Sequence, residues 1–140
     1  MGYTTRVTGE FAIEPPLTWR EIKRSPFSFP SALGHSVREY RADDLDLALR
    51  INEKTIETDE GTIVRRTAPA LVMREIDEYR ARNLVEQVQR CLDLFPGHTF
   101  TGRLECEGEE NTDLWRVAVR DGRAVRVEPR IVWPDEDGDQ

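Results

Sequence analysis

The sequence predicts an α+β fold, a two-layer sandwich in which one mainly antiparallel sheet of about six strands carries two helices on one face. Three observations support this prediction. Several segments alternate apolar and polar side chains with period two, which is typical of half-buried strands. Residues 77–95 repeat apolar side chains at the spacing of an amphipathic helix. The dipeptide Asp121-Gly122 indicates a tight hairpin, because both central residues of a type I′ turn need positive φ. The preferred topology is ferredoxin-like (split βαβ) with an added strand.

The first strand is expected in the N-terminal segment, where alternate residues suit a buried face. These residues are Tyr3, Thr5, Val7, Phe11 and Ile13. Pro15-Pro16 should end the strand, because proline cannot donate a hydrogen bond to a neighbouring strand. A short helix follows, in which Thr18 and Glu21 have the spacing of a capping box. Residues 25–36 indicate a loop whose apolar side chains pack against the core.

A β-hairpin is expected in the middle of the chain. Apolar and polar residues alternate over residues 45–52, and residues 62–72 return as the partner strand. Residues 58–61 supply the turn between them. Pro69 indicates a sheet edge or a bulge, because proline interrupts the hydrogen bonds between strands.

The second helix, over about residues 77–95, has the clearest periodic pattern in the chain. Its buried stripe is expected to include Leu84, Val88 and Leu92. Pro96-Gly97 should end the helix. We therefore expect this stripe to pack on the sheet.

Three further strands should complete the sheet. The first of them should bury Phe100, Leu104 and Cys106. The final hairpin is expected to have one inner face, made of Trp115, Val117, Val119, Val125 and Val127 and continued by Ile131 and Trp133. Its outer face would then present four arginines, Arg116, Arg120, Arg126 and Arg130.

These four arginines are the candidate binding residues of the chain. Guanidinium groups can bind carboxylate or phosphate through paired hydrogen bonds, so the face could recognise an anion or a partner. The favoured interpretation is a solvated surface, whose charge is partly compensated by Glu105, Glu107 and Glu128. The acidic stretch from Glu105 to Asp113 could also hold a hard cation, but it lacks EF-hand spacing, and pairing with arginines explains it better.

Other chemistry has little support in the sequence. Cys91 and Cys106 fall on apolar faces and are expected to be buried, reduced thiols. No Cys-x-x-Cys pair is present, and His35 and His98 lie far apart, so we expect no bound metal. Phosphate-cradling and nucleophile-elbow motifs are absent, so we expect no cofactor and no enzymatic activity.

Length and charge limit the remaining possibilities. The chain has 140 residues and a net charge of −7, which suits one domain over residues 1–134 followed by an acidic, disordered tail over residues 135–140. An acidic protein is not expected to bind nucleic acid by simple charge attraction. No apolar run approaches the roughly 20 residues needed to cross a bilayer, and no signal peptide is evident. We therefore expect a cytoplasmic protein that makes no contact with membranes.

Two stretches at the ends of the chain are distinctive. They are Gly9-Glu10-Phe11-Ala12-Ile13-Glu14-Pro15-Pro16-Leu17 with Trp19 and Glu21, and Thr101-Gly102-Arg103-Leu104 with Asp113-Leu114-Trp115-Arg116-Val117. Both resemble a small uncharacterised family of about 140 residues from actinobacteria and their phages, a domain of unknown function. The resemblance leaves residues 28–75 unmatched. It implies a source and a fold size, and it supplies no catalytic residues.

Together these observations favour a small non-enzymatic protein-interaction or regulatory protein, related to phages or mobile elements. Its partner would be another protein, whose identity the sequence does not give, and the oligomeric state stays open. The alternative is a domain that binds a small anion or nucleotide, or a minor enzyme, using the arginine-rich sheet face.

Overall fold

The computed structural model describes residues 4–27, 45–74, 76, 79–110 and 113–133. Within these residues the chain forms six strands and two helices. In chain order they are β1 (Arg6–Thr18), α1 (Trp19–Arg24), β2 (Leu47–Thr58), β3 (Gly61–Met73), α3 (Leu84–Leu94), β4 (Thr99–Glu107), β5 (Leu114–Arg120) and β6 (Arg123–Val127). The α+β class is confirmed, and the fold contains more sheet than helix.

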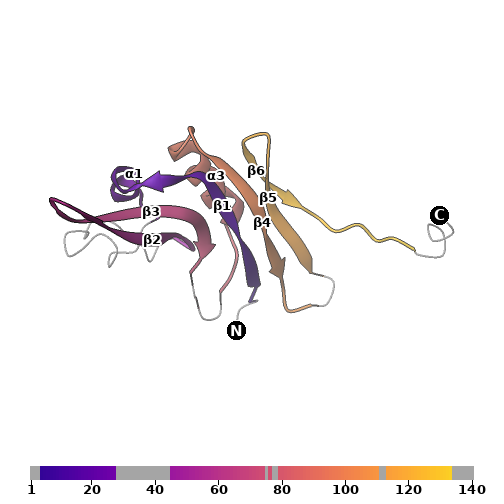
Figure 1. Ribbon diagram of the computed structural model, residues 1–140. Helices are drawn as coiled ribbons and strands as arrows, with labels where there is room; N and C mark the ends of the chain where they lie inside the picture. The colour runs from indigo at the N-terminus through magenta and orange to yellow at the C-terminus, as the bar shows by residue number, and fades with distance from the viewer. Residues whose placement is uncertain (1–3, 28–44, 75, 77–78, 111–112, 134–140) are drawn as a thin grey trace.

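The six strands form one open sheet in the order β2-β3-β1-β4-β5-β6 (Figure 1). Every pair of neighbouring strands is antiparallel. The first strand of the chain therefore lies inside the sheet, between β3 and β4. β2 and β6 form its two edges.

One hydrophobic cluster joins the sheet to both helices. Ile22 of α1 and Val88 of α3 belong to the same cluster as Phe11 and Leu71 of the central strands. We call this helix-covered side of the sheet the inner face and the opposite side the outer face. The stripe expected on the second helix is buried as predicted, with Leu84 and Leu92 on either side of Val88 along the helix.

β1 continues through Pro15 and Pro16, which corrects the prediction that these residues end it. Pairing with β4 extends as far as Glu14, opposite Thr99. Pairing with β3 is interrupted between Ala12 and Leu17. The prolines lie within this interruption. Their lack of an N–H group therefore removes no hydrogen bond from the pairing of β1 with β3.

The short helix α1 begins with the predicted capping box. The backbone N–H of Glu21 donates to Thr18 Oγ1 at 3.3 Å, and the N–H of Thr18 donates to Glu21 Oε1 at 3.0 Å. The helix ends at Arg24, just before Pro26, as expected. Phe27, the first aromatic residue of the expected loop, is buried. Phe29 and Leu33 lie outside the described residues.

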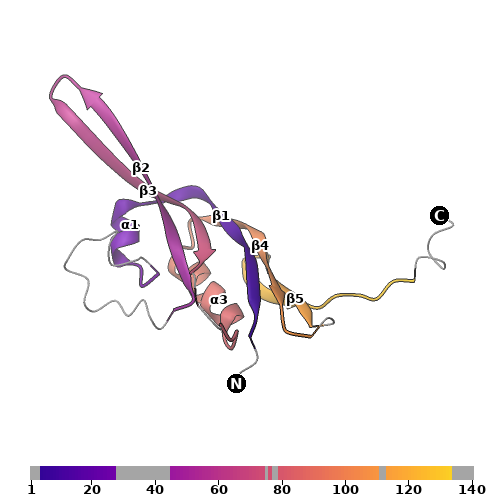
Figure 2. The same ribbon diagram turned by 90° about the horizontal axis from the view of Figure 1, so that it is seen from below.

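The middle of the chain forms the expected hairpin of β2 and β3. Its turn lies at Asp59 and Glu60. Pro69 is at an irregularity of the pairing with both neighbours of β3, which confirms a bulge rather than an edge. Beyond this bulge the hairpin extends past the body of the protein, as Figure 2 shows. We call residues 52–67 the arm.

α3 is shorter than expected, because it begins at Leu84 rather than near residue 77. Residues 79–83, which precede the helix, are not helical, and hydrogen bonds tie Tyr79 to residues distant in sequence. The carbonyl of Tyr79 accepts from the N–H of Thr5 at 2.8 Å, and its hydroxyl donates to Asp46 Oδ2 at 2.6 Å. The buried Gln87 bonds the same Asp46, accepting from its N–H at 2.8 Å and donating to Oδ2 at 3.0 Å. This network joins the residues just before β1 and β2 to α3.

Candidate functional site

The final hairpin has the predicted turn but a different set of faces. Asp121 and Gly122 have φ values of 54° and 76°, as a type I′ turn requires. A two-residue turn pairs odd-numbered residues of β5 with even-numbered residues of β6. Val117 is therefore opposite Arg126, and Arg116 is opposite Val127. Directly opposed residues point to the same side of a sheet, so Arg126 belongs to the inner face, while Val125 and Val127 belong to the outer face.

Arg126 is accordingly separated from the other arginines. Its guanidinium lies 4.2 Å from the centre of the Trp115 ring, in a cation–π contact. Its Nε donates to Glu128 Oε1 at 2.5 Å. The neighbouring Ala124 donates its N–H to Gln89 Oε1 of α3 at 2.8 Å. The helix therefore anchors the inner side of β6, and Arg126 lies at the rim of the core.

The outer face of the hairpin carries Arg116 and Arg120 as predicted, together with Arg123, which the sequence analysis did not single out. Arg116 bonds Glu105 of β4, with Nε and Nη2 at 3.1 Å and 3.0 Å from Oε1. Arg103 approaches the same oxygen at 3.6 Å. The expected compensation by Glu105 is thus present at Arg116. Arg120 and Arg123 face each other across the strands and form no ion pair with another described residue.

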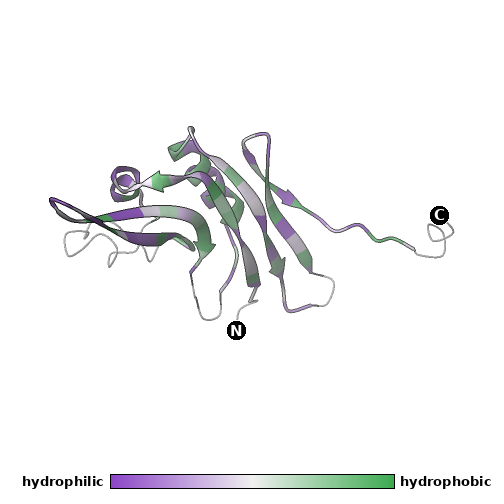
Figure 3. Ribbon diagram, in the orientation of Figure 1, coloured by the Kyte–Doolittle hydropathy of each residue, from purple (hydrophilic) through white to green (hydrophobic). Residues whose placement is uncertain are grey.

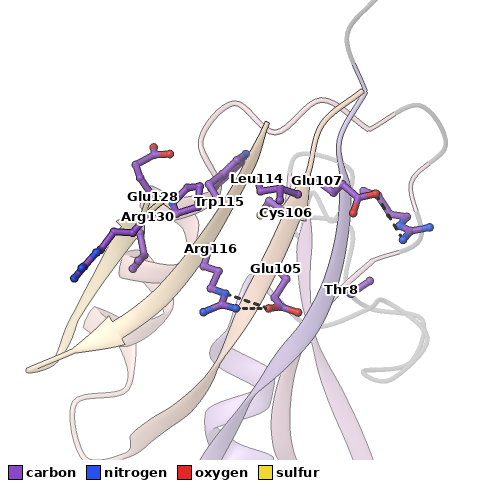
Figure 4. Close-up of a pocket in the computed structure, with 12 residues that line it drawn as sticks. Thr8, Glu105, Cys106, Glu107, Leu114, Trp115, Arg116, Glu128 and Arg130 are labelled. Carbon is purple, nitrogen blue, oxygen red and sulfur yellow. Dashed lines mark hydrogen bonds and ion pairs between the residues drawn. The ribbon is translucent and has the colours of Figure 1, made fainter. Parts of the chain in front are cut away.

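A hollow of about 510 Å³ lies on the outer face beside the start of β5 (Figure 4). Its charged lining consists of Arg6, Arg116, Arg130, Glu105, Glu107 and Glu128. It brings together Arg116 and Arg130 of the four predicted arginines, but not Arg120 or Arg126. Figure 4 shows Arg116 and Glu105 pointing toward each other, while Arg130 extends away from them. Positive and negative side chains are balanced in this hollow, so it is not a purely basic anion site.

Ion pairs in this region are exposed. Arg6 and Glu107 are 3.7 Å apart, with 76% and 55% of their side-chain surfaces exposed. Exposed pairs of this kind contribute roughly 0–1 kcal/mol to stability. Cys106 also lines the hollow, but burial raises the pKa of its thiol to about 12, despite the opposing charge of Arg126. A thiol with this pKa is protonated near neutral pH and is a poor nucleophile.

The chain after β6 leaves the sheet, which corrects the prediction that Ile131 and Trp133 continue its inner face. Residues 128–133 run outward from the body (Figure 1), and we call them the C-terminal segment. Ile131, Val132 and Trp133 are 87%, 52% and 67% exposed. Pro129 follows β6 closely and cannot donate to a neighbouring strand, which accounts for the end of pairing at Val127. Figure 3 shows the hydrophobic stretch in this extended chain.

His98, which follows Pro96-Gly97 in the sequence, lies against the cap of α1. Its side chain is 8% exposed, with Nε2 2.8 Å from Glu21 Oε2 and Nδ1 against the carbonyl oxygen of Pro15. The carbonyl of Pro15 and the carboxylate of Glu21 are both hydrogen-bond acceptors that face the ring. Burial opposes the charge of Glu21, but hydrogen bonds from Thr18 and His98 and the charge of His98 outweigh it and lower the pKa of Glu21. His35 lies outside the described residues.

A search against known families matches the whole chain. One family model aligns with residues 1–140, beyond the two ends that the resemblance covered. The chain belongs to a family of unknown function, DUF6205. No curated protein and no solved structure matches it. DUF6205 membership therefore assigns no activity to the arginines, the hollow or the C-terminal segment.

The described part of this DUF6205 chain contains no group of three histidine, cysteine, aspartate or glutamate side chains placed to hold a metal ion. In the acidic stretch from Glu105 onward, Glu105 of β4 is bonded to Arg116, and Glu109 accepts a hydrogen bond from Thr4 at 2.9 Å. Within the same residues, neither helix has the length and apolar character needed to cross a membrane.

Proposed function

We propose that this DUF6205 protein is a non-enzymatic interaction or regulatory protein that binds another protein through its C-terminal segment. The observation that supports this most directly is the exposure of three consecutive apolar residues, Ile131, Val132 and Trp133. Contiguous exposed apolar surface is unfavourable in water and often marks a binding site. Tryptophan is also enriched among the residues that dominate the energy of protein interfaces.

The backbone of the C-terminal segment supports the same proposal. Residues 128–133 are not part of the sheet, so their N–H and C=O groups have no partner among the described strands. An extended peptide with free backbone groups can add to the edge of another sheet, where alternate side chains enter pockets and give specificity. Ile131 and Trp133 have the spacing that places them on the same side of such a strand.

The proposal can be tested by site-specific photocrosslinking. A benzophenone amino acid at position 133 should crosslink a defined protein in cells that express the chain at natural levels. The matched control places the same group at Leu114, another exposed apolar position, which lies on β5. The proposal is wrong if position 133 gives no product beyond that obtained at position 114.

A second candidate function uses the hollow on the outer face. Arg116 and Arg130 line it together, which is the arrangement that an anionic ligand would need. Thermal shift with phosphate and nucleotides would test this candidate, because a ligand that binds the folded state raises the melting temperature. The shift should disappear in Arg130→Glu and persist in Arg82→Glu, which changes an exposed arginine near α3. No shift with any of these anions would reject it.

Three finer assignments are also our proposals. The cytoplasm is the expected location, since two free thiols suit a reducing compartment. An origin in actinobacteria or their phages rests on the resemblance at the chain ends. A ferredoxin-like core is supported by the order β2-β3-β1-β4 and by the succession β-α-β-β-α-β along the chain. An experimental structure with a left-handed crossover in either half would contradict that topology.

A further inference from the structure

The arm is a two-stranded ribbon with a free edge. The part of β3 from Thr67 to Val72 pairs with both β1 and β2, but residues 61–66 pair only with β2. β2 is the outermost strand of the sheet. Its outward edge, including residues 52–58, is therefore unpaired by any described strand and can accept another.

The two faces of the arm differ in how their charges are matched. On the inner side, Arg66 bonds Glu53 at 2.8 Å and lies 5.1 Å from the centre of the Trp19 ring. On the outer side, Lys54 lies directly opposite Arg65. Neither of these two forms an ion pair with another described residue. Like charges in direct opposition cost stability, so this pair is a candidate site for acidic groups from outside.

An apolar pair lies next to these cations. Ile56 is directly opposite Ile63 on the same outer side, and Ile63 is 49% exposed. The outer side of the arm thus presents two isoleucines and then two cations, separated by the two-residue period of a strand. This surface needs a partner that is apolar at one point and acidic two residues further along.

The end of this chain has that sequence. Trp133 is exposed, and Asp135 stands two positions further along the chain, with Glu136 and Asp137 next. If this segment ran antiparallel to β2, Trp133 would lie beside Ile56 and Asp135 beside Lys54. The register fits because Trp133 and Asp135 are two positions apart in sequence, as Ile56 and Lys54 are. Figures 1 and 2 place the arm and the C-terminal segment at opposite ends of the molecule, so a second copy is the better source.

We infer that the C-terminal segment of one copy adds as an antiparallel strand to the β2 edge of the arm of a second copy. This inference rests on the proposed function and names its partner. The arm itself contains three basic residues and four acidic ones, Glu53, Glu57, Asp59 and Glu60, which does not favour nucleic acid as the occupant. The contact is heterologous, so two copies can exchange segments reciprocally or many copies can form a chain.

A charge exchange between full-length variants tests the inference. The first variant, Lys54→Glu with Arg65→Glu, keeps its acidic end. The second, Asp135→Lys with Glu136→Lys and Asp137→Lys, keeps its basic arm. By sedimentation at low salt, the parent should associate as its concentration rises, and each variant alone should associate about tenfold less tightly. The mixture should associate again, because each end then meets an arm of opposite charge.

Two controls keep the outcomes distinct. Arg82→Glu with Arg90→Glu makes the same change in net charge as the first variant, at exposed positions away from the arm, and should associate like the parent. Circular dichroism should show that every variant is folded. A parent that stays monomeric, or a mixture that associates no better than its components, overturns the inference. If position 133 still crosslinks a different protein in that case, the proposed function stands without it.

Discussion

Gly9 and Gly102 lie on neighbouring strands, and each allows the other strand to approach where a side chain would prevent it. A Cβ atom on Gly9 would lie 2.3 Å from the carbonyl oxygen of Arg103 in β4. A Cβ atom on Gly102 would lie 2.4 Å from the carbonyl oxygen of Glu10 in β1. Both glycines also have positive φ, at 99° and 116°. The close contact between β1 and β4 therefore depends on one glycine in each strand.

Replacing either glycine should destabilise the centre of the sheet. Gly9→Ala and Gly102→Ala should each lower the free energy of unfolding by about 2 kcal/mol or more, because the new methyl group meets backbone and the φ value is strained. Urea denaturation measures the change. Gly97→Ala is the control, since nothing lies within 4 Å of its added Cβ. Equal stability of the Gly9 and Gly97 variants would show that β1 and β4 can separate at little cost.

Val88 tests the packing of α3 on the sheet. Val88 is fully buried, so Val88→Asp should place an unpaired carboxylate in the core and unfold the protein or cost at least about 3 kcal/mol. Arg90→Asp puts the same residue on the exposed side of the same helix and should change stability by about 0.5 kcal/mol. Thermal melting compares the two. Similar melting temperatures would mean that α3 does not cover the sheet.

The two cysteines should react slowly in the native protein. Burial raises the pKa of Cys91 and of Cys106 to about 12, and both residues are almost fully covered. Because the thiolate is the reactive form, labelling at pH 8 should be slow and should accelerate on unfolding in urea. Rapid labelling of a single thiol before unfolding would identify a local opening at that residue, in disagreement with the packing described above.

Glu21 should make stability depend on acid pH. The pKa of Glu21 is lowered in the folded state. Its ionised form therefore stabilises the fold at pH values above its ordinary pKa of 4.5. This contribution is lost as the pH falls through the lowered folded-state pKa. Glu21→Gln should therefore cost about 1 kcal/mol near neutral pH and progressively less below pH 4.5. A difference from the parent that stays constant from pH 7 to pH 3 would contradict the role of this charge.

Local patterns in the sequence predicted several elements correctly. The capping box of Thr18 and Glu21, the stripe around Val88 and the turn at Asp121 depend on residues close in sequence, so periodicity and turn chemistry suffice to find them. The inner face of β6 was predictable too, but the prediction was wrong. A two-residue turn makes partners of residues with opposite parity, and that rule places Arg126 beside Val117.

Other features depend on contacts that a single sequence does not reveal. Pro15 and Pro16 remain in β1 because the pairing with β3 is interrupted at that point. Tyr79, near the start of the expected second helix, is bonded to Asp46 and Thr5, which are distant along the chain. The exposure of Ile131 and Trp133 depends in the same way on where strand pairing ends, which is at Val127.

The central position of β1 has a consequence for biosynthesis. β1 leaves the ribosome before the other strands of this sheet, but Glu10 pairs with Val72 on one side and with Arg103 on the other. A nascent chain cannot complete the middle of the sheet until β4 has been made. Before that point Phe11 and Ile13 have no complete cover, and the strand has an open edge. Newly made chains should therefore depend on chaperones until β4 has been synthesised, and chains that stop before β4 should aggregate.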